Sequence, residues 1–199
     1  MERERVVMIA RDLVVRLGQS CERIHVAGSV RREVPAVKDL EIVYIPRMEV
    51  VQAGLFPDLD QKRPLTDETI EQLVEGGVLR WDTRVKRNGP KYKRLIHTAS
   101  GLVVELFAAR PENWGLILAL RTGPGDFNHK LVKRRSQGGA MPSDMRMDGG
   151  FLWRGGEKIP TPTEEAFFGA LGLPVIPPRE RSVERLEQVL VESLAEAEV

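Results

Sequence analysis

Three carboxylates stand in stretches of the sequence that are otherwise apolar. Asp39 and Glu41 lie in DLEIVYI, Glu105 lies in LVVELF, and both stretches have the composition of buried strands. Side chains two residues apart in a strand point to the same face, so Asp39 and Glu41 share a face. If the two strands are neighbours, Glu105 joins them, and carboxylates that face together need cations. Such oxygen clusters bind hard divalent cations, and Mg²⁺ usually shares them with substrate phosphates.

A glycine–serine turn precedes the acidic pair. Gly28 allows backbone to approach a ligand closely, and Ser29 supplies a hydroxyl. Arg31 and Arg32 supply forked donors that match phosphate oxygens. The turn and the acids together indicate a nucleoside triphosphate held by the turn and metal ions held by the carboxylates, the parts that two-metal phosphoryl transfer requires. The structural alternative is that the turn is ordinary and that the acids belong to a solvated strand.

The elements that must position these residues follow from periodicity and turn signals. In the first half we expect helices over residues 2–17 and 66–77, the second capped by Thr66, and strands over 23–27, 39–45, 79–87, 91–98 and 102–107. In the second half we expect helices over 111–121 and 126–135, a hairpin around residues 148–150, a helix capped by Thr161, and a last helix over 182–197.

The composition changes near Pro111, where strand-rich sequence gives way to helices and basic residues. We therefore expect an α+β fold with two domains. Residues 1–110 would form a mixed β-sheet with flanking helices, and residues 111–199 would form a smaller domain of helices and a hairpin.

Several motifs, in order and spacing, resemble those of the family X DNA polymerases, in the polymerase-β-like nucleotidyltransferase superfamily. The segment GSVRR begins eleven residues before the acidic pair, and Glu105 stands where that family has a third catalytic aspartate. Thr122-Gly123 followed by DFN resembles the family's T-G-S…F-N segment, and EEAFFGALGLPVIPPRER resembles its C-terminal segment. The resemblance covers nearly the whole chain, most weakly residues 47–90, and corresponds to the palm and thumb domains only.

This resemblance implies roles for individual residues. Asp39 and Glu41 would hold two Mg²⁺ ions, with Mn²⁺ as an alternative, and Glu105 would complete the catalytic metal site and activate the primer 3′-hydroxyl. The residues implied to bind the nucleotide are Gly28, Ser29, Arg32, Lys38, Thr122, Gly123 and Asn128. Those implied to contact DNA are Tyr92, Lys93, Lys130, Lys133 and Arg134.

The expected function is Mg²⁺-dependent addition of nucleotides to the 3′-hydroxyl of gapped or primed DNA, with release of pyrophosphate. The sequence departs from the family pattern in using Glu41 and Glu105 in place of aspartates. It also has Gly123-Pro124 at a turn where the resemblance implies a cis peptide bond. Proline lowers the free-energy cost of the cis form. Two alternatives stay open: template-independent transfer to a small molecule, a protein or an RNA end, and a non-catalytic nucleotide- or DNA-binding remnant.

Composition limits the remaining classes. The net charge of +1 gives no global attraction for nucleic acid, so basic residues matter locally. They gather at Arg84, Lys86, Arg87, Lys91, Lys93 and Arg94 and again over 130–135, as DNA contacts or as solvated faces. No apolar run approaches the ~20 residues of a membrane span, and one cysteine excludes an intrachain disulfide. We expect a cytoplasmic monomer without a membrane partner.

Overall fold

The computed structural model describes residues 1–51, 61–84 and 88–197, so Lys86 and Arg87 lie outside the described residues. The chain folds as two compact units. Unit 1 contains residues 1–26 and 35–109, and unit 2 contains residues 27–34 and 110–199. The later boundary lies within one residue of the expected one. The segment 27–34, which carries the glycine–serine turn, belongs to unit 2, although it was expected in the first domain.

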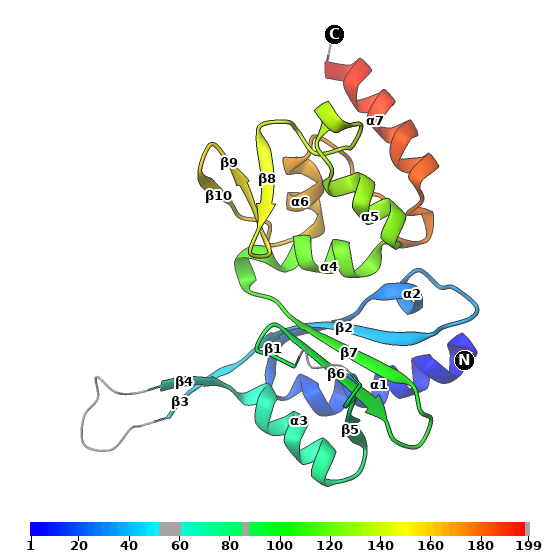
Figure 1. The fold of residues 1–199 in the computed structure, drawn as a ribbon, viewed down its shortest axis with the longest axis vertical. Helices are drawn as coiled ribbons and strands as arrows, with labels where there is room; N and C mark the ends of the chain where they lie inside the picture. The colour runs from blue at the N-terminus through cyan, green and yellow to red at the C-terminus, as the bar shows by residue number, and fades with distance from the viewer. Residues whose placement is uncertain (52–60, 85–87, 198–199) are drawn as a thin grey trace. The chain divides into compact units, whose positions relative to one another are not determined.

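Unit 1 is built on a five-stranded mixed sheet with the order β1-β2-β7-β6-β5 (Figure 1). Its strands are β1 (Cys21–Val26), β2 (Asp39–Pro46), β5 (Leu79–Trp81), β6 (Tyr92–His97) and β7 (Val103–Ala108). Strands β2 and β7 run parallel, and the other neighbours are antiparallel. Strands β3 (Met48–Val51) and β4 (Gln61–Pro64) form a separate antiparallel pair. The expected α+β class with a mixed sheet is confirmed.

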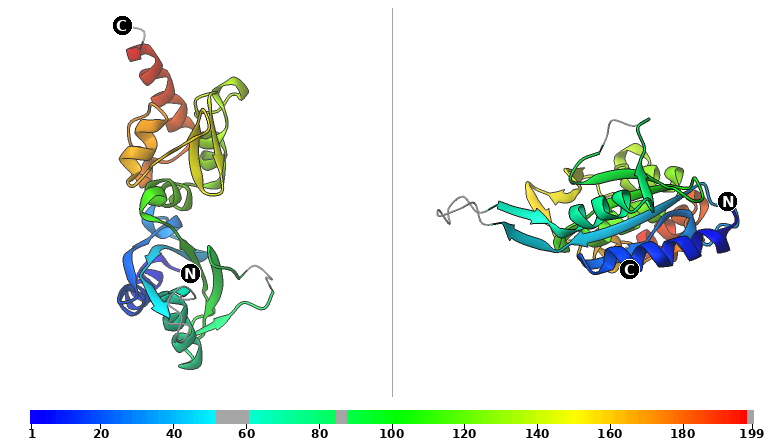
Figure 2. Two further views of the ribbon diagram at one scale, coloured as in Figure 1. Left: turned by 90° about the vertical axis from the view of Figure 1, so that its left-hand side faces the viewer. Right: turned by 90° about the horizontal axis from the view of Figure 1, so that it is seen from below.

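Helices α1 (Arg3–Gly18) and α3 (Leu65–Glu75) pack against the sheet of unit 1 (Figures 1 and 2). In the first four residues of β2, β6 and β7, buried residues alternate with half-buried ones, and Leu40, Leu95 and Leu106 are among the buried ones. Lys93 shares its face with Leu95 and pairs with Asp67 of α3, which identifies this as the helix-covered face. Asp39, Glu41 and Glu105 therefore lie on the opposite face. The expected cap Thr66 instead lies buried within the first turn of α3, and Pro64 takes the N-cap position.

Unit 2 combines helices with a small sheet. Its helices are α2 (Gly28–Arg31), α4 (Trp114–Thr122), α5 (Gly125–Val132), α6 (Glu164–Ala170) and α7 (Val183–Ala197), with single 3₁₀ turns at Pro111–Asn113, Arg135–Gln137 and Pro178–Glu180. Its sheet has the order β10-β9-β8, from β8 (Met145–Asp148), β9 (Phe151–Arg154) and β10 (Glu157–Ile159). The expected hairpin is β8–β9, and β10 extends it.

Three local expectations in unit 2 need correction. Helix α5 ends at Val132, short of residue 135, because the chain turns back and Gly139 packs where a Cβ would lie 2.0 Å from the Lys133 carbonyl oxygen. Thr163, two residues after Thr161, caps α6 by accepting a hydrogen bond from the Ala166 amide. All described peptide bonds are trans, so Gly123-Pro124 is not cis.

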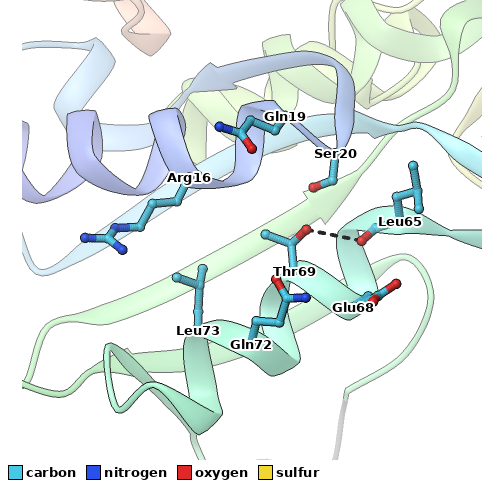
Figure 3. A pocket seen from close by; sticks show the side chains of 8 residues that line it. All are labelled: Arg16, Gln19, Ser20, Leu65, Glu68, Thr69, Gln72 and Leu73. Atoms are coloured by element: carbon cyan, nitrogen blue, oxygen red, sulfur yellow. Dashed lines mark hydrogen bonds between the residues drawn. The ribbon is translucent and has the colours of Figure 1, made fainter.

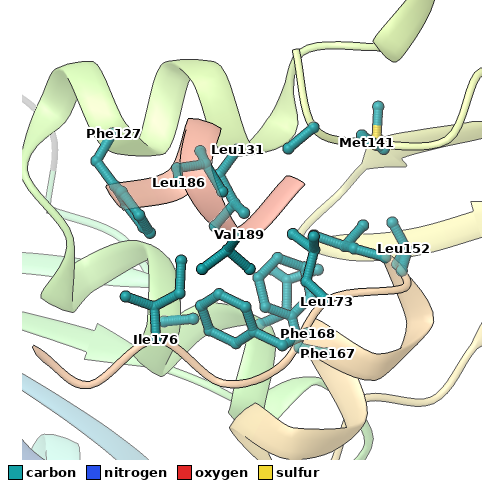
Figure 4. Packing of buried hydrophobic residues seen from close by; sticks show 14 of the residues in the cluster. Phe127, Leu131, Met141, Leu152, Phe167, Phe168, Leu173, Ile176, Leu186 and Val189 are labelled. Carbon is teal, nitrogen blue, oxygen red and sulfur yellow. The ribbon is translucent and has the colours of Figure 1, made fainter. Parts of the chain in front are cut away.

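The core of unit 2 gathers apolar side chains from α4, α5, α6, α7 and the small sheet (Figure 4). Phe127, Phe167, Phe168 and Leu186 are fully buried, and the two neighbouring phenylalanine rings meet edge to face at 5.6 Å. This packing fixes α4 and α5 and hence the turn between them. In the described part of the chain, no helix is long and apolar enough to cross a membrane.

Candidate active site

The predicted carboxylates lie on one face of the unit 1 sheet. Glu41 of β2 is the register partner of Glu105 on the parallel strand β7, and Asp39 lies two residues before Glu41. All three side chains are half-buried. Burial, and then the negative charge of Glu105, raises the pKa of the Asp39 carboxyl above its ordinary value. The acids destabilise one another's charge, and a bound cation would relieve this.

Glu105 already has two donors in the structure. The Tyr92 hydroxyl donates to Glu105 Oε1 at 2.5 Å, and Arg94 Nη1 donates to the same oxygen at 2.9 Å. Arg94 is the register partner of Glu105 on the antiparallel strand β6. Its Nε also donates to Asp82 Oδ2 at 3.0 Å. The Asp82 side chain is 1% exposed, and hydrogen bonds from Arg84 and then Arg94 hold its pKa well below the usual range.

This Tyr92–Arg94–Asp82 network was missed by the sequence reasoning. The available signal was the spacing of Tyr92 and Arg94, which are two apart in an expected strand and therefore share a face. The sequence does not show which strand lies beside them.

The three acids suit a divalent metal ion on the condition that Glu105 gives up its present hydrogen bonds. Among the described residues, no group of three or more His, Cys, Asp or Glu is arranged to hold a metal ion. Glu105 is instead engaged by Tyr92 and Arg94. The three acids nevertheless supply only oxygen donors on adjacent register positions, and burial together with the charge of Glu105 raises the pKa of Asp39. Binding of an ion would require Glu105 to exchange these hydrogen bonds for the metal.

The DNA contacts expected in unit 1 have other partners. Lys93 is 7% exposed and forms an ion pair with Asp67 at 3.0 Å, which is a role inside unit 1 in place of the expected phosphate contact. The Tyr92 ring packs against Phe107, with centroids 5.1 Å apart, while its hydroxyl serves Glu105. Lys38, expected to bind the nucleotide, is exposed directly before β2.

The glycine–serine turn opens α2 in unit 2. Gly28 has φ 62°, in the left-handed region where a side chain would be strained. The Ser29 hydroxyl is buried and has no hydrogen-bond partner among the described residues, so it is available to a ligand oxygen. Arg32, the predicted triphosphate contact, donates from Nη1 to the Thr122 carbonyl oxygen at the end of α4.

Arg31 belongs to a buried charge network. It donates from Nη1 to Thr122 Oγ1 and Glu164 Oε1, each at 2.9 Å, and from Nη2 to Glu164 Oε2 at 2.5 Å. Arg181, whose side chain is fully buried, donates to Glu164 Oε1 at 2.8 Å. Burial opposes ionisation of Glu164, but the two arginines outweigh it and hold its pKa below the ordinary value. The network ties α2 to α4 and α6, and sequence reasoning missed it.

The turn between α4 and α5 is held by Asn128. Its Nδ2 donates to the carbonyl oxygens of Leu120 at 2.6 Å and Gly123 at 2.8 Å. A Cβ on Gly123 would lie 2.2 Å from Asn128 Oδ1, so only glycine allows this approach. Oδ1 is buried without a protein partner in the described ranges, which leaves an acceptor for a ligand donor. This arrangement is compatible with the nucleotide contacts predicted for Thr122, Gly123 and Asn128.

The basic residues after α5 differ in their surroundings. Lys130 forms an ion pair with Glu187 of α7, and Arg134 Nε donates to the Met145 carbonyl oxygen at 3.2 Å. The Lys133 side chain is exposed. Arg134 is also exposed, whereas Lys130 is half-buried.

Two cavities of unit 1 contain none of the predicted site residues. One, of about 540 Å³, lies between α1 and α3 and is lined mostly by polar side chains that include Arg16, Ser20 and Thr69 (Figure 3). The other, of about 280 Å³, is lined by residues that include Asp82 and Arg84. The second therefore borders the network that holds Glu105.

Residues 117–182 match the family model described as DNA polymerase beta thumb. The match covers about a third of the chain, lies wholly within unit 2, and includes the Thr122–Asn128 turn and Glu164. Comparison of the sequence with the curated proteins returned no match. Through this match in its second unit, the chain is similar to the family X DNA polymerases in their thumb domain.

Proposed function

We propose that this protein is a divalent-metal-dependent nucleotidyltransferase of the DNA polymerase type, which extends the 3′-end of gapped or primed DNA. The thumb match in unit 2 supports the polymerase relationship. The observation that carries the catalytic part is the parallel register of β2 and β7, because it sets Glu105 beside Glu41 and on the face of Asp39.

In this reaction the primer 3′-oxygen attacks the α-phosphorus of a nucleoside triphosphate. The bond from that phosphorus to the bridging oxygen breaks, and pyrophosphate leaves. The hydroxyl proton goes to Glu105, while Ser29 and Arg32 bind the triphosphate and Asn128 contacts the base. Asp39, Glu41 and Glu105 would hold Mg²⁺, which when bound neutralises charge on the reacting phosphates.

Arg94 and Tyr92 position Glu105 in this proposal. Both donate to Glu105 Oε1 from the neighbouring strand, and Arg94 is held in turn by Asp82. Because Arg94 keeps the Asp82 partner, it can release Glu105 without leaving its own charge unpaired.

The test is extension of a labelled primer presented single-stranded, on an open template and in a one-nucleotide gap. Each deoxynucleotide and ribonucleotide is offered with Mg²⁺ or Mn²⁺. We expect addition of the complementary nucleotide in the gapped and open-template substrates, and loss of it in Glu105→Gln. Glu71→Gln is the matched control, because Glu71 is an exposed acid on α3 of the same unit.

Two other outcomes of this assay would support the alternative functions. Untemplated addition to the single strand would move the protein to the terminal-transferase class. No addition, together with tight nucleotide binding, would identify a non-catalytic nucleotide-binding protein.

A further inference from the structure

The small sheet of unit 2 has two unlike faces. Met145 of β8 and Leu152 of β9 are buried, and with Met147 and Ile159 they pack into the core cluster. Phe151 and Trp153 flank Leu152 on β9 and therefore point to the outer face. Both aromatic side chains are only half-buried, so two large rings lie at the surface without contributing to that core.

Cations from both neighbouring strands lie over these rings. Trp153 has Arg146 of β8 and Lys158 of β10 as its register partners. The Arg146 guanidinium lies 5.0 Å from the indole centroid, and the Lys158 ammonium lies 5.5 Å from it on the other strand. Lys158 also lies 4.4 Å from the Phe151 ring. Arg110, which precedes α4, approaches Phe151 at 6.0 Å.

The indole is held in place by a backbone contact. Trp153 Nε1 donates to the Asp148 carbonyl oxygen at 3.2 Å. The hydrogen bond fixes the direction of the ring, so little side-chain freedom remains to be lost when a planar ligand stacks on it.

The basic side chains on this face can exchange their acidic partners for an anionic ligand. Arg146 pairs with Asp148 at 3.3 Å, with side chains 48% and 68% exposed, and Arg110 pairs with Glu112 at 4.0 Å. Exposed pairs of this kind contribute little free energy, so a polyanion can displace the carboxylates. In the described part of the chain, Lys158 makes no ion pair, and its ammonium lies over the rings of Phe151 and Trp153.

Cations that alternate with fixed aromatic rings match the chemistry of single-stranded nucleic acid. Unpaired bases stack on aromatic faces, and basic side chains follow the phosphates. A duplex keeps its bases stacked on each other and would meet only the cations. An acidic protein surface would use the charges but not the ring faces.

We propose that the outer face of the β8–β9–β10 sheet (yellow in Figure 1) binds single-stranded DNA. Bases stack on Phe151 and Trp153, and phosphates contact Arg110, Arg146 and Lys158. None of these residues belongs to the predicted catalytic or nucleotide-binding set, and the surface acts whether or not the catalytic proposal holds. For a polymerase, it would hold an unpaired strand.

The experiment measures binding by the full chain without metal ion or nucleotide, so it is independent of catalysis. Fluorescence anisotropy compares labelled oligothymidylate with a strand of the same length made of abasic sites, over a range of salt. Wild type should prefer the strand that carries bases. Trp153→Ala should weaken oligothymidylate binding about tenfold and remove the preference, since one stacked base contributes about 1–3 kcal/mol. Trp153→Phe should restore it.

The charge component is tested by Lys158→Gln. This variant should keep the preference for bases but lower the magnitude of the slope of log K against log salt by about 0.7, the value for one phosphate contact to a single strand. Arg185→Gln is the control for loss of one positive charge, because Arg185 lies on α7 and its side chain is 40% exposed. Thermal unfolding of each variant shows whether the fold is kept.

Unchanged oligothymidylate binding in both Trp153→Ala and Lys158→Gln would overturn the proposal. Equal affinity of wild type for the abasic strand would also overturn it, because stacking would then play no part. Should Trp153→Ala fail to fold, Phe151→Leu and Lys158→Gln give the same two readouts. Concentration-dependent self-association that depends on Trp153, without DNA binding, would assign the face to a second copy of the chain instead.

Discussion

At the scale of single residues, the surroundings of Glu105 decide how the acidic face works. Arg94 donates to Glu105 at 2.9 Å and to Asp82 at 3.0 Å, so one cation is shared between a candidate metal ligand and a buried structural acid. Tyr92 adds a third contact. A metal ion must therefore compete with Arg94 for Glu105.

This competition predicts that Arg94→Gln binds divalent ions more tightly than wild type. Removing a half-exposed positive charge beside the ligands should gain roughly 1 kcal/mol, about fivefold in affinity. Mn²⁺ titration by electron paramagnetic resonance, without DNA or nucleotide, measures this directly. Arg80→Gln, which removes an exposed cation from β5, should change little. Weaker Mn²⁺ binding in Arg94→Gln would show that the arginine organises the acids rather than competing with the ion.

The Glu164 network makes a second prediction at this scale. Glu164→Gln would leave Arg181 buried without a countercharge, which should cost about 3–5 kcal/mol of unfolding free energy. The folded pKa of Glu164 lies below its ordinary value of 4.5. Its stabilisation is therefore complete above about pH 4.5 and is lost as the pH falls through the folded pKa.

Urea unfolding at several pH values measures this contribution. The gap between wild type and Glu164→Gln should be largest near pH 7 and should shrink in acid, while the exposed control Glu192→Gln should match wild type throughout. A gap that does not depend on pH would mean that packing, and not charge, accounts for the loss.

The candidate site could be predicted from the sequence only where lone charges interrupt apolar stretches. Asp39, Glu41 and Glu105 satisfy this condition, and the structure places them on one face. Arg94 and Tyr92, which contact Glu105, could not be predicted in this way. They lie in β6, and only the order of the strands in the sheet shows that β6 is next to β7. Lys93 lies in the same basic stretch but points to the opposite face, where it pairs with Asp67.

At the scale of elements, α4 and α6 pack at a point where no side chain fits. A Cβ on Gly115 would lie 1.8 Å from the Thr163 carbonyl oxygen, which belongs to the N-cap of α6. Because the contacting atoms belong to the backbone, they cannot move aside for a Cβ as a flexible side chain would. Gly169 in α6 has no atom within 4 Å of its Cβ position and is exposed.

These two glycines give a matched pair of substitutions. Gly115→Ala should destabilise unit 2 by about 1–3 kcal/mol through overpacking. Gly169→Ala should be neutral or stabilise by up to about 1 kcal/mol, because alanine favours the helix. Chemical denaturation of both variants distinguishes the cases, and equal stability of the two would contradict the packing described for α4.

The burial of Cys21 in β1 predicts a low reactivity of its thiol. Cys21 is 3% exposed, and burial raises the pKa of its thiol to about 11. At pH 8 we expect a disulfide reagent to label it only after unfolding, and as the single cysteine it gives an unambiguous signal. Fast labelling of the native protein would show that β1 opens locally.

Element types could be predicted where periodicity is strong, as in α1, α7 and the hairpin β8–β9. Strand β10 was missed because three residues of Glu-Lys-Ile show too little alternation. The cap of α6 shifted from Thr161 to Thr163 because both threonines suit the position and only the final packing chooses between them. The end of α5 depended on the close approach of Gly139 to the Lys133 backbone.

At the scale of the whole molecule, the chain passes between its units more than once. The segment 27–34 leaves unit 1 after β1 and returns at residue 35, and Arg31 fastens it within unit 2. Sequence composition changes only near residue 111, so it could not indicate this earlier crossing. The proposed triphosphate residues Ser29 and Arg32 thus belong to the unit that carries the thumb, and the proposed metal ligands belong to the other.

Nucleotidyl transfer by this protein is proposed to depend on the acids of β2 and β7. The most direct measurement is single-turnover addition of the complementary deoxynucleotide to a one-nucleotide gap with Mg²⁺, for wild type, Glu105→Gln and the control Glu71→Gln. We predict addition by wild type and Glu71→Gln, and a loss of about a hundredfold or more in Glu105→Gln, since Glu105 is proposed to accept the proton and to bind the metal. Addition at the same rate by Glu105→Gln, or none by wild type, would contradict the account.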